Sequence, residues 1–124
     1  MKARRVLLVD DDELIRELVA TTLGTGEFGI LMAEDGPSAL DVARDERPDL
    51  IFLDVAMPGI DGVEVCRLLR QDERTRNTVI VMLTARSSDA DRQRALAAGA
   101  NAYVVKPFSP LALRRLVEQL DTGH

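Results

Sequence analysis

The chain has 124 residues and a formal net charge of -5 at pH 7, and 46% of its residues are hydrophobic. This length and composition predict one globular domain, spanning residues 1–124, with a sizeable core. The negative charge argues against direct nucleic-acid binding, no apolar run approaches the roughly 20 residues of a membrane helix, and the single cysteine, Cys66, fits a reducing cytoplasm.

The first third of the chain alternates between strand and helix patterns. Residues 5–9 are β-branched or Leu-rich, as in a buried strand, and they stop at three consecutive acids, Asp10, Asp11 and Asp12. A helical stripe follows, with apolar residues at positions 14, 15, 18, 19 and 23. A helix N-terminus favours negative charge, but capping needs one or two acids rather than three. Residues 28–33 predict a weaker strand near a sheet edge.

The centre of the chain carries a continuous apolar run over residues 50–53 that ends at Asp54. Such a run predicts a strand buried on both faces, hence a central parallel strand. The helix before it begins at Gly36-Pro37 and ends at Arg47-Pro48. Asp54 therefore stands at the carboxyl end of a buried strand, where open α/β sheets place their ligands. The alternative is that Asp54 only caps the next turn.

The second half repeats the pattern. A helix over residues 62–70 buries Cys66 as a small core residue, and a strand over 79–83 ends at Thr84. Ser87-Ser88-Asp89 offers a cap for a short helix over 90–98, which Gly99 ends. A last strand over 102–105 ends at Lys106, and Ser109-Pro110 begins an amphipathic final helix with apolar residues at 111, 113, 116, 117 and 120.

Five strand-and-helix repeats predict an α/β fold, a doubly wound parallel sheet with helices on both faces. The carboxyl ends of its strands would collect Asp10, Asp11, Asp54, Thr84 and Lys106. Two carboxylates about 4 Å apart repel by roughly 4 kcal/mol at an effective dielectric of 20, so three need compensation. An all-oxygen acidic site suits Mg²⁺. Beside a threonine and a lysine, such a site predicts phosphoryl chemistry with Asp54 as the nucleophile.

The chain resembles the receiver domains of bacterial two-component response regulators over about residues 4–120. The resemblance implies a flavodoxin-like fold of five strands in the order 2-1-3-4-5. The residues that carry it are Val9-Asp10-Asp11-Asp12, Asp54 with Met57-Pro58-Gly59 and Asp61-Gly62, Leu83-Thr84-Ala85, and Ala98-Gly99-Ala100 leading to Tyr103 and Lys106-Pro107-Phe108.

The resemblance also implies a role for each site residue. Asp54 would accept a phosphoryl group from the phosphohistidine of a histidine kinase, and Thr84 and Lys106 would contact that group. Asp11 and Asp54 would bind Mg²⁺ directly, and Asp10 would act through water. The backbone carbonyl of Ala56 would complete the protein ligands. The Lys106-Pro107 bond is expected to be cis.

Phosphorylation would act as a switch. Thr84 would move toward the phosphoryl group and vacate space for Tyr103, which biases the surface of the fourth helix, last strand and last helix. The alternative for Tyr103 is a half-buried strand aromatic. Ala56 and Arg86 occupy positions that influence aspartyl-phosphate hydrolysis in the family, in a direction the sequence does not give. Two arginines of the last helix, at 114 and 115, face solvent or a dimer partner.

These expectations describe a cytoplasmic signalling switch rather than an enzyme with outside substrates. Its partners would be a histidine kinase or histidine phosphotransfer protein, a downstream output protein or domain, and a second copy on phosphorylation, with no direct contact to nucleic acid or membrane. One alternative is a Mg²⁺-dependent phosphohydrolase. Such enzymes usually carry a second acid two residues after the nucleophile, and here that residue is Ala56. Another is a degenerate receiver that serves only as an interaction module.

Overall fold

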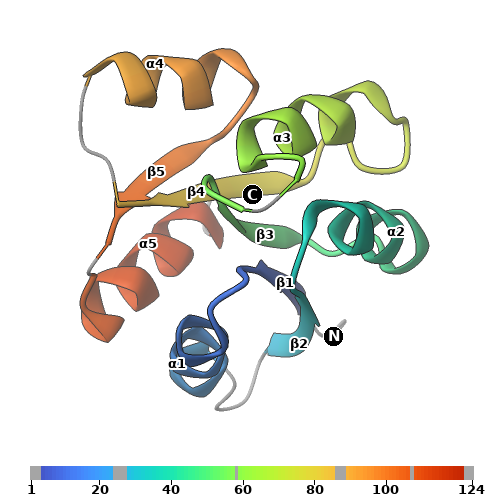
Figure 1. Ribbon diagram of the computed structural model, residues 1–124. Helices are drawn as coiled ribbons and strands as arrows, with labels where there is room; N and C mark the ends of the chain where they lie inside the picture. The colour runs from blue at the N-terminus through green and yellow to red at the C-terminus, as the bar shows by residue number, and fades with distance from the viewer. Residues whose placement is uncertain (1–3, 24–27, 58, 86–88, 107, 122–124) are drawn as a thin grey trace.

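The computed structural model describes residues 4–23, 28–57, 59–85, 89–106 and 108–121. Within these ranges five strands and five helices alternate along the chain (Figure 1). The strands are β1 (Arg4–Val9), β2 (Phe28–Ala33), β3 (Leu50–Asp54), β4 (Val79–Thr84) and β5 (Ala102–Val105). The helices are α1 (Glu13–Leu23), α2 (Gly36–Glu46), α3 (Gly62–Gln71), α4 (Asp89–Ala97) and α5 (Pro110–Asp121).

The strands form one parallel sheet in the order β2-β1-β3-β4-β5. This confirms the predicted α/β doubly wound fold, including the weaker strand at one edge. The chain runs from β1 outward to β2 and then returns to the other side of β1 as β3. The strand order therefore reverses between β1 and β3, and the ligand crevice of such a sheet opens there, at the carboxyl ends.

The hydrophobic core lies in two layers, because alternate residues of each strand point to opposite faces of the sheet. One face packs against α1 and α5, and the other against α2, α3 and Ala95 of α4 (Figure 1). Cys66 is fully buried in the second layer, as predicted. β3 is buried along its whole length, which confirms its central position.

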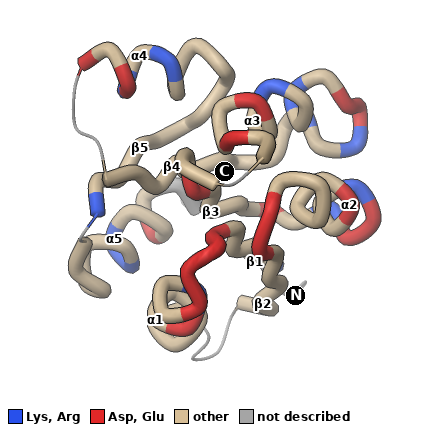
Figure 2. Tube along the Cα trace, in the orientation of Figure 1, with Lys and Arg blue, Asp and Glu red and all other residues tan. Residues whose placement is uncertain are grey.

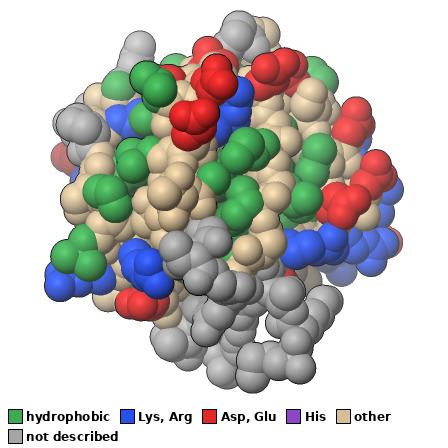
Figure 3. Space-filling model, turned by 90° about the horizontal axis from the view of Figure 1, so that it is seen from below, with side chains coloured by type: hydrophobic (Ala, Val, Ile, Leu, Met, Phe, Trp, Pro, Cys, Tyr) green, Lys and Arg blue, Asp and Glu red, His purple; other side chains and the backbone are tan. Residues whose placement is uncertain are grey.

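The apolar stripe predicted for α1 is only partly buried. Val19 and Leu23 pack on the sheet, whereas Leu14 remains 73% exposed and Leu18 remains 36% exposed. The stripe is wider than the arc of helix surface that one sheet face can cover, so part of it stays in solvent. Seen from below, hydrophobic side chains accordingly lie among acidic and basic ones on the surface (Figure 3). In α5, Leu111 is exposed for the same reason.

Helix ends follow the capping residues of the sequence. Asp35 accepts a hydrogen bond from the Ser38 amide at 2.8 Å, and the Ser109 hydroxyl accepts one from the Ala112 amide at 3.0 Å. Gly99 follows α4 with a φ of 107°, a backbone conformation that favours glycine. The predicted cap at residues 87 and 88 lies outside the described residues, as does His124.

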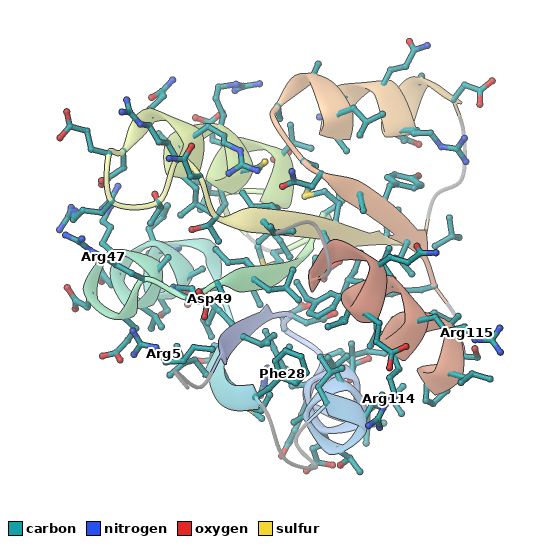
Figure 4. All side chains as sticks on the ribbon, turned by 180° about the vertical axis from the view of Figure 1, so that it is seen from behind. Arg5, Phe28, Arg47, Asp49, Arg114 and Arg115 are labelled. Carbon is teal, nitrogen blue, oxygen red and sulfur yellow. The ribbon has the colours of Figure 1, made fainter. Side chains whose placement is uncertain are left out.

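The amino ends of the strands lie at the edge of the sheet opposite the expected site. There the Arg5 amide donates to the Asp49 carboxylate at 2.9 Å, which joins the start of β1 to the turn before β3 (Figure 4). In the same view Arg114 of α5 lies near α1, where it donates to the Thr22 carbonyl at 3.3 Å, and Arg115 extends away from the domain. Among the described residues, no helix is both long and apolar enough to cross a membrane.

Candidate functional site

The carboxyl ends of β1, β3, β4 and β5 bring together the side chains that the sequence singled out. Asp10 directly follows β1, and Asp54 is the last residue of β3. Thr84 ends β4 and is 3% exposed. Its carbonyl accepts a hydrogen bond from the Lys106 amide at 2.7 Å, so β4 and β5 end side by side. In Figure 2 the acidic turn between β1 and α1 is the long red segment that leads into α1.

Each of the three consecutive acids has different surroundings. Asp12 caps α1, because its carboxylate accepts from the Leu14 amide at 2.9 Å. Asp10 is 2% exposed, and its two carboxylate oxygens accept from the Asp12 amide at 2.9 Å and from Lys106 Nζ at 2.7 Å. Asp11 is exposed, and no hydrogen bond to its carboxylate arises within the described part of the chain. Capping thus explains one acid and leaves two for the site.

Asp54 is a buried carboxylate whose proton affinity is raised. It is 5% exposed, and its Oδ1 lies 3.4 Å from Lys106 Nζ and 3.3 Å from the Ala56 amide. Burial, and after it the charge of Asp10, raise the pKa of Asp54 to about 6, although Lys106 and the Ala56 amide oppose them. Ionisation of Asp54 at neutral pH therefore raises the free energy of the folded state, and a nearby cation would offset this cost.

Lys106 is the cation that holds the two buried acids together. Burial alone would lower the pKa of its ammonium, but the hydrogen bond to Asp10 and the charges of Asp54 and Asp10 outweigh burial and raise it. Lys106 therefore stays charged at neutral pH. The ammonium pairs with the two buried carboxylates, and Asp11 adds a third carboxylate to the cluster, so the cluster keeps an excess of negative charge.

The acidic cluster has the donor set of a hard divalent cation. One carboxylate oxygen from each of Asp10, Asp11 and Asp54 lies within 4.8 Å of the other two. Oxygen ligands of this kind suit Mg²⁺, which takes few protein carboxylates and keeps several waters. Both oxygens of Asp10 already accept hydrogen bonds, whereas Asp11 is open to solvent. The residues present therefore fit a hard divalent cation such as Mg²⁺.

Tyr103 occupies β5 beside β4, in register with Met82, and its ring is half-buried. The guanidinium carbon of Arg92, on α4, lies 5.5 Å from the centre of the Tyr103 ring, a cation–π geometry. The role of Tyr103 as a switch stays a prediction. The expected contribution of Arg86 and the cis bond at Pro107 fall outside the described residues.

Sequence reasoning missed two arginines near this site. Arg92 contacts Tyr103 across α4 and β5, and Arg16 of α1 donates from Nη1 to the Asp10 carbonyl at 2.6 Å. Both contacts join separate elements, so the sequence held only an indirect signal. For Arg16 that signal is its position four residues after the capping residue Asp12. Residues four apart lie on the same face of a helix, so the Arg16 side chain can reach back to the acidic loop.

Comparison with known proteins agrees with this geometry. The family model for the response regulator receiver domain matches residues 6–118. The phosphate regulon transcriptional regulatory protein PhoB of Klebsiella pneumoniae is 44% identical over 111 residues, which cover 90% of this chain and 48% of that protein. The DNA-binding response regulator MtrA of Mycolicibacterium smegmatis is 42% identical over 110 residues, 89% of this chain and 47% of that protein. This chain thus spans about half the length of these curated relatives.

Solved structures match over nearly the whole chain. The chemotaxis response regulator CheY4 of Vibrio cholerae is 35% identical with a TM-score of 0.91, and the match covers 96% of this chain and 99% of that one. The receiver domain of the sensor histidine kinase PA1611 of Pseudomonas aeruginosa is 30% identical with a TM-score of 0.86, covering 95% and 97%. That receiver domain has a magnesium ion coordinated in its active site cleft.

Proposed function

Because this chain belongs to the response regulator receiver domain family, we propose that it is a phosphorylation-activated signalling switch. In this proposal Asp54 accepts a phosphoryl group from the phosphohistidine of a histidine kinase or a histidine phosphotransfer protein. The observation that carries the proposal is the cluster of Asp10, Asp11 and Asp54 at the carboxyl ends of the strands, with Lys106 paired to Asp10 and Asp54. A cluster of this composition suits a phosphoryl group and a divalent cation together.

The transfer step uses Asp54 as the nucleophile. A carboxylate oxygen of Asp54 bonds to phosphorus while the bond from phosphorus to the donor imidazole nitrogen breaks, and that nitrogen leaves with its electron pair and takes up a proton. With a pKa of about 6, Asp54 is mostly ionised at neutral pH and ready to attack. Lys106 Nζ lies 3.4 Å from the Asp54 carboxylate, where it can pair with an oxygen of the arriving phosphoryl group.

In this proposal four residues would hold the Mg²⁺ ion. Asp11 and Asp54 bind it directly, Asp10 acts through water, and the Ala56 carbonyl is the backbone ligand. When bound, the ion neutralises charge on the carboxylates and on the phosphoryl oxygens. The two hydrogen bonds that Asp10 already accepts support its indirect role.

The output step follows from charge. Phosphorylation adds about -1.5 to -2 charges and strong acceptors at Asp54, and the Thr84 hydroxyl turns to donate to them. Tyr103 then moves into the vacated space, which changes the surface of α4, β5 and α5. A cytoplasmic output protein, an output domain or a second copy of the chain reads this surface. The named transcriptional and DNA-binding relatives, about twice as long, support an output domain in the whole protein.

The proposal does not include turnover of outside substrates. A phosphohydrolase that uses an aspartyl nucleophile needs a general acid to protonate the leaving alcohol. Two residues after Asp54 the chain has Ala56, whose side chain cannot transfer a proton. The domain therefore promotes only its own phosphorylation and dephosphorylation.

Incubation with Mg²⁺ and acetyl phosphate tests the proposal directly. We expect intact-mass measurement to show one added phosphoryl group on the wild-type chain, stable in acid and labile in base, and none on Asp54→Asn. Asp12→Asn is the matched control, because Asp12 caps α1 and contributes no ligand. This control should be phosphorylated at close to the wild-type level.

Two results would argue for other functions. Sustained Mg²⁺-dependent release of phosphate from a generic phosphomonoester would show an enzyme acting on outside substrates. Absence of Mg²⁺ binding at millimolar concentrations, together with no phosphorylation, would leave the domain as an interaction module.

Tyr103 offers an optical test of the output step. It is the single tyrosine of a chain without tryptophan, so intrinsic fluorescence reports this side chain alone. With Mg²⁺ and beryllofluoride, a phosphoryl mimic, we expect acrylamide to quench Tyr103 less, because the ring moves inward. Thr84→Ala should bind the mimic without this change in quenching. Equal protection of Tyr103 in Thr84→Ala would show that the two residues are not coupled.

A further inference from the structure

Arg16 connects α1 to the acidic loop that precedes it. Its Nη1 donates to the backbone carbonyl of Asp10 at 2.6 Å, a contact between residues six positions apart. The Asp10 amide donates to the Ala33 carbonyl of β2 at 3.2 Å. With its carboxylate bonded to the Asp12 amide and to Lys106, Asp10 is thus held through its amide, its carbonyl and its side chain.

This anchoring determines where Asp11 lies. The carbonyl of Asp10 and the amide of Asp11 belong to one planar peptide group, so a bond to that carbonyl orients the whole plane. The orientation of the plane sets the position of the Asp11 Cα and the direction in which its side chain leaves. Within the described residues no donor holds the Asp11 carboxylate itself. The direction of the Asp11 carboxylate toward Asp54 therefore depends on the backbone that Arg16 holds in place.

We propose that Arg16 is a positioning residue for the cation site: by fixing the Asp10–Asp11 peptide it aims the Asp11 carboxylate at the metal. The inference rests on the proposed Mg²⁺ site and concerns a residue that touches neither the metal nor the phosphoryl group. Partners of this kind, one step removed from a metal, typically change its affinity 10- to 100-fold.

The direction in which Mg²⁺ affinity changes when Arg16 is removed distinguishes a positioning role from a purely electrostatic one. Arg16 is a cation beside an acidic site, so electrostatics alone predicts that its removal strengthens Mg²⁺ binding. Positioning predicts the opposite, because a freed peptide lets Asp11 turn away from Asp54. Arg16 also lines an open cavity of about 310 Å³ with Met32, Glu34 and Ser38, so a shorter side chain at position 16 leaves space rather than a clash.

The test is a Mg²⁺ titration followed by NMR at the backbone amides of the acidic loop, with the full chain. We expect Arg16→Met to weaken Mg²⁺ affinity about 10-fold. Arg16→Lys, which keeps the charge but presents a single ammonium instead of the planar fork, should lie between Arg16→Met and the wild type. Arg115→Met removes the same charge from an exposed side chain of α5 and should leave affinity within about twofold of wild type.

Unfolding in urea without Mg²⁺ separates local positioning from loss of the fold. The proposal requires that Arg16→Met stays folded in the titration and that hydrogen exchange rises at the Asp12 amide, which donates to the Asp10 carboxylate. Unchanged or tighter Mg²⁺ binding by Arg16→Met would overturn the role of Arg16 while leaving the proposed function intact. A wild-type chain that binds no Mg²⁺ would instead contradict the cation site on which both depend.

Discussion

Asp54→Asn is expected to stabilise the metal-free domain at pH 7 by roughly 2 to 3 kcal/mol, although it removes the proposed phosphoacceptor. In the folded chain the pKa of Asp54 is about 6, above its ordinary value of 3.8, because burial and Asp10 disfavour its charge. Ionising it in the folded state at neutral pH therefore costs up to roughly 3 kcal/mol. A neutral amide of the same shape avoids that cost, and Lys106 then forms its ion pair with Asp10 alone.

The same shift predicts the pH dependence of wild-type stability. The folded chain holds the Asp54 proton more tightly than the unfolded chain does. Protonation of Asp54 therefore contributes to the free energy of unfolding, and this contribution is complete below about pH 4. It is lost as the pH rises from about 4 through about 6, and it stays lost above that. Urea unfolding from pH 4 to pH 8 should show this decline in the wild-type chain and not in Asp54→Asn.

Adding Mg²⁺ provides a second test of the predicted stabilities. Saturating Mg²⁺ should recover stability in the wild-type chain at pH 7, because the cation offsets the carboxylate charges, and should recover much less in Asp54→Asn. Asp12→Asn, at an exposed capping position, should not gain stability and should lose only a few tenths of a kcal/mol, because Asn caps a helix about as well as Asp and only the charge at the helix N-terminus is removed. A metal-free Asp54→Asn that is less stable than wild type at pH 7 would show that Asp54 is not under electrostatic strain.

Gly62→Ala is expected to destabilise the domain by about 3 kcal/mol and to slow phosphorylation of Asp54. Gly62 begins α3 directly beneath the site, and its amide donates to the Val55 carbonyl at 2.8 Å. A Cβ at this position would lie 2.1 Å from the Asp54 carbonyl oxygen and 2.8 Å from the Val55 Cα. These are backbone atoms, so relief requires either α3 or the end of β3, which carries Asp54, to move.

Gly59 provides the control for this steric effect. Its φ of 80° makes a side chain unfavourable, but a Cβ there would have no atom within 4 Å among its surroundings. Gly59→Ala should therefore cost only about 1 to 2 kcal/mol of backbone strain and leave the phosphorylation rate nearly unchanged. Thermal unfolding and acetyl phosphate kinetics compare the two variants. Equal losses in both would mean that the close approach of Gly62 to Asp54 has no special role.

The sequence by itself determined the elements and the edge of the sheet at which the site lies. Strand and helix periodicities, with Gly36-Pro37, Ser109-Pro110 and Gly99 as boundaries, located every helix and strand to within a residue or so. This succeeded because periodicity and capping are local properties of the chain. The apolar run before Asp54 indicated a central strand, and parallel strands necessarily bring their carboxyl ends to one edge.

Tertiary structure alone decided which partners each charged group has. Lys106 bonds to Asp10 across 96 positions of sequence, and Arg16 reaches the Asp10 carbonyl rather than solvent. Burial of α1 likewise depends on how far it rotates on the sheet, which leaves Leu14 exposed although the periodicity included it. The close packing of Gly62 under Asp54 has no signal beyond the glycine itself. Such contacts depend on strand order and side-chain direction, which no local pattern encodes.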